Sequence, residues 1–272
     1  MAKEHKYRSK IVDSGTSKYN SRLLVFTPTR GTVRMEWVVA RYGQIIPTNW
    51  GMVTYQQFLD SFVPLRYSVA DAQNLACKEL VEKNYEWLLM IEDDTIPPPD
   101  AFIRFNKYMQ KGDIPVVSGL YFTKSEPSEP LIFRGRGTST YNSWKMGDKV
   151  WADGVPTGML LIHGDIIRAM WKEAPDYNAM GTITKKIFNT PTDMWFDADA
   201  GHVFTKTGTS DLQWCEDVIE GKFLEKAGFK EIQKKKYPFL VDTNIFCKHI
   251  TPEGVQYPMQ TVVDHFNPLV KD

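Results

Sequence analysis

Three adjacent acidic residues are the clearest candidates for chemistry in this sequence. Glu92, Asp93 and Asp94 directly follow an apolar run from Trp87 to Ile91. A proline run then prevents further sheet pairing, so the pattern predicts a buried strand with acids at its carboxyl end, where open α/β sheets bind ligands. Adjacent carboxylates repel one another unless a cation or hydrogen-bond donors offset their charge, and hard oxygen ligands favour Mg²⁺ or Mn²⁺. Acids before prolines also form ordinary loops and helix caps, which is the simpler interpretation.

Other polar residues fall at the ends of predicted strands or near the start of a helix. Thr27 and Pro28 close the first strand, His249 follows the last strand, and Glu216 and Asp217 lie near the start of the last long helix. A lone histidine at a strand end is commonly a hydrogen-bonded structural group, and acids near a helix start can simply favour the helix dipole. Their position at element ends nevertheless makes them candidates for a common site.

Hydrophobic periodicity predicts the elements that must position these residues. Strands and helices alternate along the first half of the chain, which is typical of an α/β fold with a mostly parallel sheet flanked by helices. Residues 174–208 lack sustained periodicity and are predicted to form a long loop. The predicted strands are 23–27, 52–55, 87–91, 116–122, 131–133, 159–162 and 239–246, and the predicted helices are 35–42, 68–80, 101–109, 165–171 and 212–227.

Composition limits the class of protein. Of the 272 residues 42% are hydrophobic, enough for a substantial core in one large domain or two small ones. Lysine plus arginine and aspartate plus glutamate both number 33, so no global field draws the protein onto nucleic acid or an anionic membrane. Three widely spaced cysteines indicate a reducing compartment rather than a disulfide framework. Residues 1–20 are predicted to be a flexible polar leader, and the absence of a long apolar run predicts no transmembrane segment and a cytoplasmic protein.

The order of these motifs resembles a GT-A glycosyltransferase, close to the family 2 type and to small phage or prokaryotic members. Residues 26–31 resemble the opening strand and nucleotide-base loop, and residues 87–99 resemble the strand that carries the DxD motif. Residues 214–218 resemble the late ED motif, and residues 241–249 resemble the closing strand with its metal-binding histidine. The resemblance implies one GT-A domain over residues 21–272 with a Rossmann-like sheet. Its nucleotide-sugar-binding half would be residues 21–125 and its acceptor-side half residues 126–272.

The resemblance also implies a metal site. Asp94 would bind Mn²⁺ or Mg²⁺ directly and His249 would complete the site. Glu92 or Asp93 would hold the ribose or a metal-bound water, and Glu92 could also reach the metal itself. The family commonly has aspartate at the position of Glu92, and the longer arm of glutamate favours an indirect role.

Further roles follow from the same resemblance. The catalytic base that removes the acceptor proton would be Asp217, with Glu216 as the second choice. An Ala-Arg-Asn sequence of the family stands here as Ala72-Gln73-Asn74, so one possible diphosphate contact is lost, and Asn74 could equally buttress the fold. The remaining donor-pocket residues would be Thr27, Pro28 and Arg30 in the nucleotide-base loop, and Asp153 and Gly158 near the donor sugar.

The function that we expect is metal-dependent transfer of a sugar from a nucleoside diphosphate sugar, such as a UDP- or GDP-sugar, to an acceptor hydroxyl with inversion. One alternative is a metal-dependent sugar nucleotidyltransferase. Another is a catalytically inactive glycan-binding protein of the same fold. The sequence leaves open whether the acceptor is a glycan, a protein, a lipid or a modified nucleic acid, and it leaves open the oligomeric state.

Overall fold

The apolar runs of the sequence pair into one six-stranded sheet. The structure is a computed structural model that describes residues 18–259 apart from 60, 136–139 and 198–201. Pairing is parallel between the first two strands of the sheet order and again between the fourth and fifth, and it is antiparallel elsewhere. Four strands therefore run in one direction and two oppose them, which confirms the predicted α/β fold with a mostly parallel sheet. The order is β1 (Ser21–Phe26), β2 (Tyr85–Ile91), β6 (Met159–His163), β4 (Val116–Leu120), β11 (Phe239–Phe246) and β5 (Lys149–Ala152).

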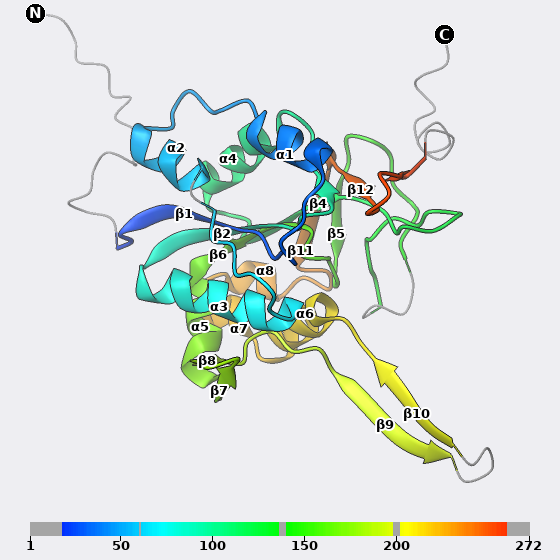
Figure 1. Ribbon diagram of the computed structural model, residues 1–272. Coiled ribbons are helices and arrows are strands. Elements are labelled where there is room, and N and C mark those ends of the chain that lie inside the picture. The colour runs from blue at the N-terminus through cyan, green and yellow to red at the C-terminus, as the bar shows by residue number, and fades with distance from the viewer. Residues whose placement is uncertain (1–17, 60, 136–139, 198–201, 260–272) are drawn as a thin grey trace, which may run out of the picture.

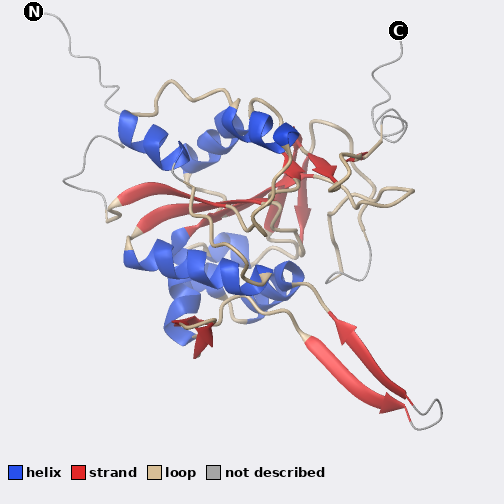
Figure 2. Ribbon diagram, viewed as in Figure 1, coloured by secondary structure: helices blue, strands red, loops and turns tan. Residues whose placement is uncertain are grey.

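Helices cover both faces of this sheet (Figures 1 and 2). Alternate side chains of β2 enter different cores: Trp87, Leu89 and Ile91 pack under the first helical layer, whereas Leu88 and Met90 pack under the second. A strand buried on both faces has to be apolar throughout, which explains the continuous run in the sequence. The first layer holds α1 (Met35–Tyr42), α2 (Met52–Leu59) and α4 (Ala101–Lys111), and the second holds α3 (Val69–Glu82), α5 (Gly164–Glu173), α6 (Ser210–Glu220), α7 (Phe223–Lys226) and α8 (Lys230–Gln233).

Local signals place several helix ends where the sequence predicts them. Ser68 caps α3, because its side chain accepts a hydrogen bond from the amide of Asp71. Gly112 ends α4 in the left-handed conformation with φ 66°. Four predictions of elements are wrong. The predicted strand 52–55 is the start of α2, which buries Thr54 and Phe58, four residues apart on one helical face.

The predicted helix 212–227 is broken into α6 and α7. Lys222 has φ 54°, a left-handed conformation that cannot continue a helix. The predicted strand 131–133 makes only isolated bridges within the part of the chain that the structure describes.

The long loop predicted over residues 174–208 contains two β-hairpins instead. The first joins β7 (Asp176–Ala179) to β8 (Thr182–Lys185) through Met180 and Gly181, which both have positive φ. The second pairs β9 (Thr192–Asp197) with β10 (His202–Thr207) and extends away from the body of the molecule (Figure 1). Within β7 and β8 only Ala179 and Thr184 are buried, so that hairpin gives no sustained apolar period in the sequence.

The two predicted halves of the domain contribute alternately to one sheet. Residues 21–125 supply β1, β2 and β4, and residues 126–272 supply β5, β6 and β11. The predicted leader falls outside the described residues over 1–17, but its last residues are anchored, because Lys18 Nζ and Tyr19 Oη both lie within 2.7 Å of Asp165 Oδ2. Among the helices of the described chain, none combines the length and apolar character that crossing a membrane requires.

Candidate active site

A small second sheet brings the end of β2 against the end of the chain's last long strand. This sheet is formed by β3 (Thr95–Ile96), β12 (Lys248–Ile250) and β13 (Gln256–Tyr257). Thr95 lies opposite His249 in the register, and the amide of Ile250 donates a hydrogen bond of 2.8 Å to the carbonyl of Asp94. Residues about 155 positions apart are thereby adjacent. Asp94 and His249 come together as the sequence predicted.

Asp94 carries two basic neighbours on one oxygen. Its Oδ2 lies 2.5 Å from Lys124 Nζ and 3.3 Å from His249 Nε2. Burial alone would raise the pKa of Asp94, but the hydrogen bonds and charges of His249 and Lys124 lower it to about 2. Asp94 is therefore ionised throughout the neutral range.

The orientation of His249 suits a metal ligand. Its Nδ1 lies 2.8 Å from the carbonyl oxygen of Phe122, so Nδ1 has to carry the proton. In a neutral imidazole the lone pair of Nε2 then points at the carboxylate of Asp94, and this pairing is favourable only with a proton or a cation between them. A histidine that donates its second N–H to a backbone carbonyl is the usual arrangement for metal-ligating histidines.

The described residues supply only part of a metal site. They include no group of three or more His, Cys, Asp or Glu side chains that could hold an ion. Asp94 and His249 fit a divalent ion nevertheless, because Asp94 Oδ1 is buried and lacks a hydrogen-bond partner among the described residues. Ligands from outside the protein, such as water, would have to complete the coordination of an ion here.

Glu92 lines the same cleft as Asp94, and its side chain is also tied into the protein interior. Its role as a metal ligand stays a prediction. Glu92 Oε1 accepts a hydrogen bond of 2.9 Å from Thr157 Oγ1. Thr157 in turn accepts from Gln73 Nε2 at 3.1 Å, and Ser210 Oγ donates to Gln73 Oε1 at 2.9 Å. This buried chain connects β2 to α3 and α6, and Gln73 takes part in it with both ends of its amide.

The pKa of Glu92 is raised to about 8, first by burial and then by the charges of Asp94 and Asp211. Glu92 is therefore mainly neutral at pH 7. A neutral carboxyl group can donate a hydrogen bond as well as accept one.

Asp211 is a site residue that the sequence analysis missed. It lies in the first turn of α6, and its carboxylate accepts hydrogen bonds from Thr209 and from the backbone of Leu212 and Thr157. Burial raises its pKa, although these hydrogen bonds lower it. The charge of Asp211 raises the pKa of Glu92 and of Tyr121, so Asp211 lies close enough to Glu92 to belong to one group of acids with it. The only signal in the sequence was an acid at a helix start, which is common at helix caps.

Asp217 lies elsewhere. It sits two turns further along α6, accepts a hydrogen bond of 2.8 Å from Gln213, and lines a separate pocket of about 300 Å³ together with Glu220 and Lys186. Its neighbour Glu216 is half-buried on the same helix. The structure brings neither residue to the acids that follow β2.

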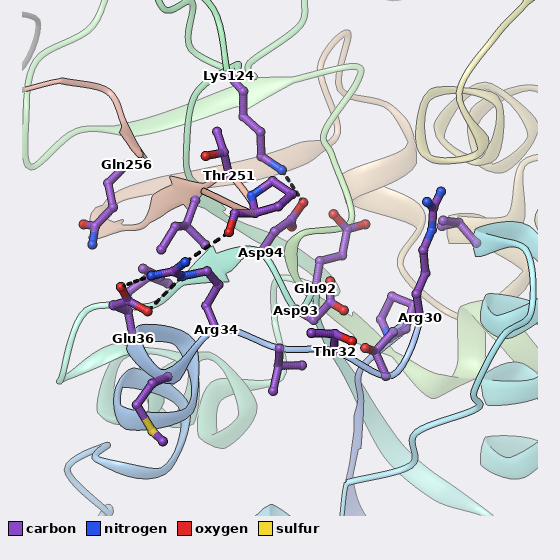
Figure 3. A pocket seen from close by; sticks show the side chains of 18 of the residues that line it. Arg30, Thr32, Arg34, Glu36, Glu92, Asp93, Asp94, Lys124, Thr251 and Gln256 are labelled. Carbon is purple, nitrogen blue, oxygen red and sulfur yellow. Dashed lines mark hydrogen bonds and ion pairs between the residues drawn. The ribbon is translucent and has the colours of Figure 1, made fainter. Parts of the chain in front are cut away.

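Glu92, Asp93 and Asp94 line a large cleft of about 1430 Å³ (Figure 3), whereas Asp211 lies behind Glu92 and is not among the lining residues. Pro28 and Arg30 line it from the loop after β1, whereas Thr27 is buried. Asp93 also lines the cleft and bonds to Thr29, although burial raises its pKa. The cleft therefore lies at the carboxyl ends of β1 and β2, the edge at which open α/β sheets bind their ligands.

Three other predicted residues serve the framework. Asn74 is 1% exposed and makes its side-chain hydrogen bonds to Tyr177, Ile187 and Phe188, so its amide buttresses β7 and the segment between β8 and β9. Asp153 accepts a hydrogen bond from the amide of Gly135 at 2.8 Å.

Gly158 does permit a close approach, but to protein. Its amide donates to Tyr121 Oη at 2.6 Å, and a Cβ at this position would lie 2.7 Å from Thr95 Oγ1. The carbonyl of Gly158 accepts from the amide of Glu92 at 3.0 Å, so this glycine holds the start of the acidic turn.

The comparisons with known proteins bear on the fold. No protein-family model matches the chain, and no curated protein sequence matches it. Its structure is similar to the crystal structure of A197 from STIV, with a TM-score of 0.51 and 15% identity over 86% of this chain and 88% of that one. The fold is GT-A-like.

Two weaker similarities were also found. S. aureus TarS matches with a TM-score of 0.42 and 9% identity, over 83% of this chain and 36% of that one. A putative glucose-1-phosphate thymidylyltransferase from Bacillus anthracis matches with a TM-score of 0.31 and 10% identity, over 57% of this chain and 76% of that one. The GT-A-like fold predicted from the motif order is confirmed, whereas family 2 membership stays a prediction.

Proposed function

We propose that this protein is a metal-dependent glycosyltransferase of the family 2 type, which transfers a sugar from a UDP- or GDP-sugar to an acceptor hydroxyl with inversion. The observation that carries the proposal is the pairing of His249 with Asp94, which lines a large cleft beyond β1 and β2. The GT-A-like fold supports it, because ligands bind at this edge of such sheets.

The cleft residues divide the work of donor binding. Pro28 and Arg30 would form the wall for the nucleoside and Asp93 would hold the ribose, since all three residues line the cleft. Asp94 and His249 would hold Mn²⁺ or Mg²⁺. The bound ion would offset the negative charge that develops on the leaving diphosphate.

We assign the general base to Asp211 rather than to Asp217. Asp211 belongs to the acidic group around Glu92, whereas Asp217 lines a different pocket. In the proposed step the acceptor oxygen bonds to the anomeric carbon and its proton passes to the Asp211 carboxylate. The bond between the anomeric carbon and the diphosphate oxygen breaks with its electron pair on the diphosphate, and a single displacement inverts the configuration.

The test compares three aspartate-to-asparagine variants. We expect Asp94→Asn to lose the stabilisation that a nucleoside diphosphate plus Mn²⁺ gives in thermal unfolding, which is roughly 2.7 kcal/mol at 100 times the dissociation constant. Asp211→Asn should keep that stabilisation but transfer sugar about 10²- to 10⁴-fold more slowly. Asp217→Asn is the matched control on the same helix and should transfer normally.

Several outcomes would contradict the proposal. Normal transfer by Asp211→Asn together with loss in Asp217→Asn would return the base to the ED motif. Release of pyrophosphate from a nucleoside triphosphate and a sugar phosphate would indicate a nucleotidyltransferase. Sugar binding that needs neither metal nor nucleotide would indicate a glycan-binding protein.

A further inference from the structure

Lys124 is presented to the cleft by a structured loop rather than by a loose one. The loop returns on itself, because Phe122 pairs with Pro130 and the amide of Thr123 donates to the carbonyl of Glu129 at 2.9 Å. The amide of Glu129 donates to Thr123 Oγ1 at 3.0 Å. Lys124 therefore leaves the loop at a defined position beside Asp94.

The ammonium group of Lys124 lies where a cation is needed. It contacts the same carboxylate oxygen that faces His249 Nε2, at 2.5 Å, and its side chain lines the cleft (Figure 3). The Lys124 side chain is 28% exposed, so it can move into the cleft without opening the core. An ammonium group on Oδ2 and a divalent ion on either oxygen of the same carboxylate would lie close together and repel each other strongly. The two cations are therefore alternatives at Asp94.

We propose that Lys124 is a built-in counter-ion that competes with the divalent ion for Asp94. When metal and donor bind, the Lys124 side chain moves and its ammonium group contacts the donor diphosphate instead. This inference rests on the proposed function, because the diphosphate belongs to the nucleotide-sugar donor. Lysine suits the task, since it is a point charge on a flexible stem and is a common ligand of phosphate groups.

Removal of the ammonium group should then have two opposite effects. Without Lys124, Asp94 is free to accept metal, so Mn²⁺ alone should bind more tightly. The diphosphate loses a contact, so a nucleoside diphosphate at saturating Mn²⁺ should bind less tightly. A general loss of folding would weaken the binding of both Mn²⁺ and nucleotide. Tighter Mn²⁺ binding together with weaker nucleotide binding therefore identifies the competition.

The experiment uses the full chain with Lys124→Met, which keeps most of the stem but removes the charge. Mn²⁺ binding without nucleotide is measured from the electron paramagnetic resonance signal of free Mn²⁺. The binding of UDP and of GDP is measured by calorimetry at saturating Mn²⁺. We expect Mn²⁺ affinity to rise about tenfold and nucleotide affinity to fall about tenfold, each equivalent to 1.4 kcal/mol.

Two controls accompany it. Lys172→Met removes an exposed lysine from α5 in the second helical layer and should change neither affinity. In an Asp94→Asn background, Lys124→Met should no longer raise Mn²⁺ affinity, because the carboxylate that both cations share is gone.

Unchanged Mn²⁺ affinity in Lys124→Met overturns the proposal, and so does unchanged nucleotide affinity when the wild type binds UDP or GDP. A third outcome is that the wild type binds neither UDP nor GDP while Lys124→Met binds Mn²⁺ more tightly. This outcome would support the competition at Asp94 but reject the proposed transferase function, so failure of one proposal can be told from failure of the other.

Discussion

At the scale of single residues, the polar groups beneath the cleft act through their protonation states. Asp94 is held ionised by Lys124 and His249, whereas Glu92, two residues earlier, is held mainly neutral by burial. Environment rather than residue type therefore separates the roles of two adjacent carboxyl groups, as it does in many active sites. The same reasoning applies away from the cleft, at His163.

His163 should make the protein less stable in acid. Burial lowers its pKa to about 4, although Asp165 opposes the shift, and its Nδ1 accepts the amide of Asp165 at the start of α5. The unfolded chain takes up this proton below about pH 6.5, whereas the folded protein does so only near pH 4, so stability is lost as pH falls through that window. The loss should be about 3 kcal/mol at most. Urea unfolding of the wild type and of His163→Asn should be measured between pH 7 and pH 4. The free energy of unfolding should fall less steeply with decreasing pH in the variant. Equal falls in the two proteins would show that another group is responsible.

At the scale of elements, one side chain joins α3 to the segment before β9. Asn74 Oδ1 accepts from the amides of Ile187 and Phe188, and its Nδ2 donates to the Phe188 carbonyl and to Tyr177. These bonds are buried, so α3 fixes the path of the chain that leads to β9. The buttressing interpretation is the one that the contacts support.

Asn74→Ala should therefore destabilise the fold strongly. It leaves several backbone groups unpaired, and we expect a loss of about 3 kcal/mol or more in the free energy of unfolding. Asn178→Ala removes one exposed hydrogen bond to Gly181 and should cost about 1 kcal/mol or less. Urea unfolding of both variants checks this. A folded Asn74→Ala protein with unchanged stability and weaker nucleotide binding would instead favour the donor role expected from the sequence.

The elements also show what the sequence could and could not predict. The run from Trp87 to Ile91 specifies its strand because both faces must be apolar, and Ser68 marks a helix start because its side chain caps the helix. Residues 52–55 were misassigned because apolar and β-branched residues in a short segment suit a strand or a buried helix turn equally.

Two site residues, Lys124 and Asp211, were not predicted for a different reason. Lys124 meets Asp94 through a loop contact, and Asp211 meets Glu92 through the packing of α6 against the turn at Thr157. Neither contact has a periodic or motif signal, because each depends on where a loop or helix end lands in three dimensions. His249 could be predicted, since it follows a strand that ends at the same edge of the sheet.

At the scale of the whole molecule, the site depends on both parts of the chain at once. The order of strands interleaves early and late segments, and the small sheet carries His249 back to the end of β2. Metal ligation by Asp94 and His249 would therefore couple the end of the chain to its centre. Binding of Mn²⁺ and nucleotide should raise the unfolding temperature of the molecule as a unit.

The hairpin of β9 and β10 stands apart from that unit. Met194 and Phe196 are exposed on one face of β9, 70% and 65% respectively, and the hairpin extends away from both helical layers (Figure 1). A two-stranded ribbon without a core is only marginally stable in water.

Amide hydrogen exchange should reveal this contrast. The backbone amides of β9 and β10 should exchange through local opening, whereas those of β2 and β6 should exchange only on global unfolding. Mass spectrometry of the exchanging protein checks this, and equal protection of the hairpin and β2 would contradict it. The body of the molecule contributes little to the protection of the hairpin amides. Slowed exchange in β9 and β10 would therefore report directly on an acceptor or partner that binds to the hairpin.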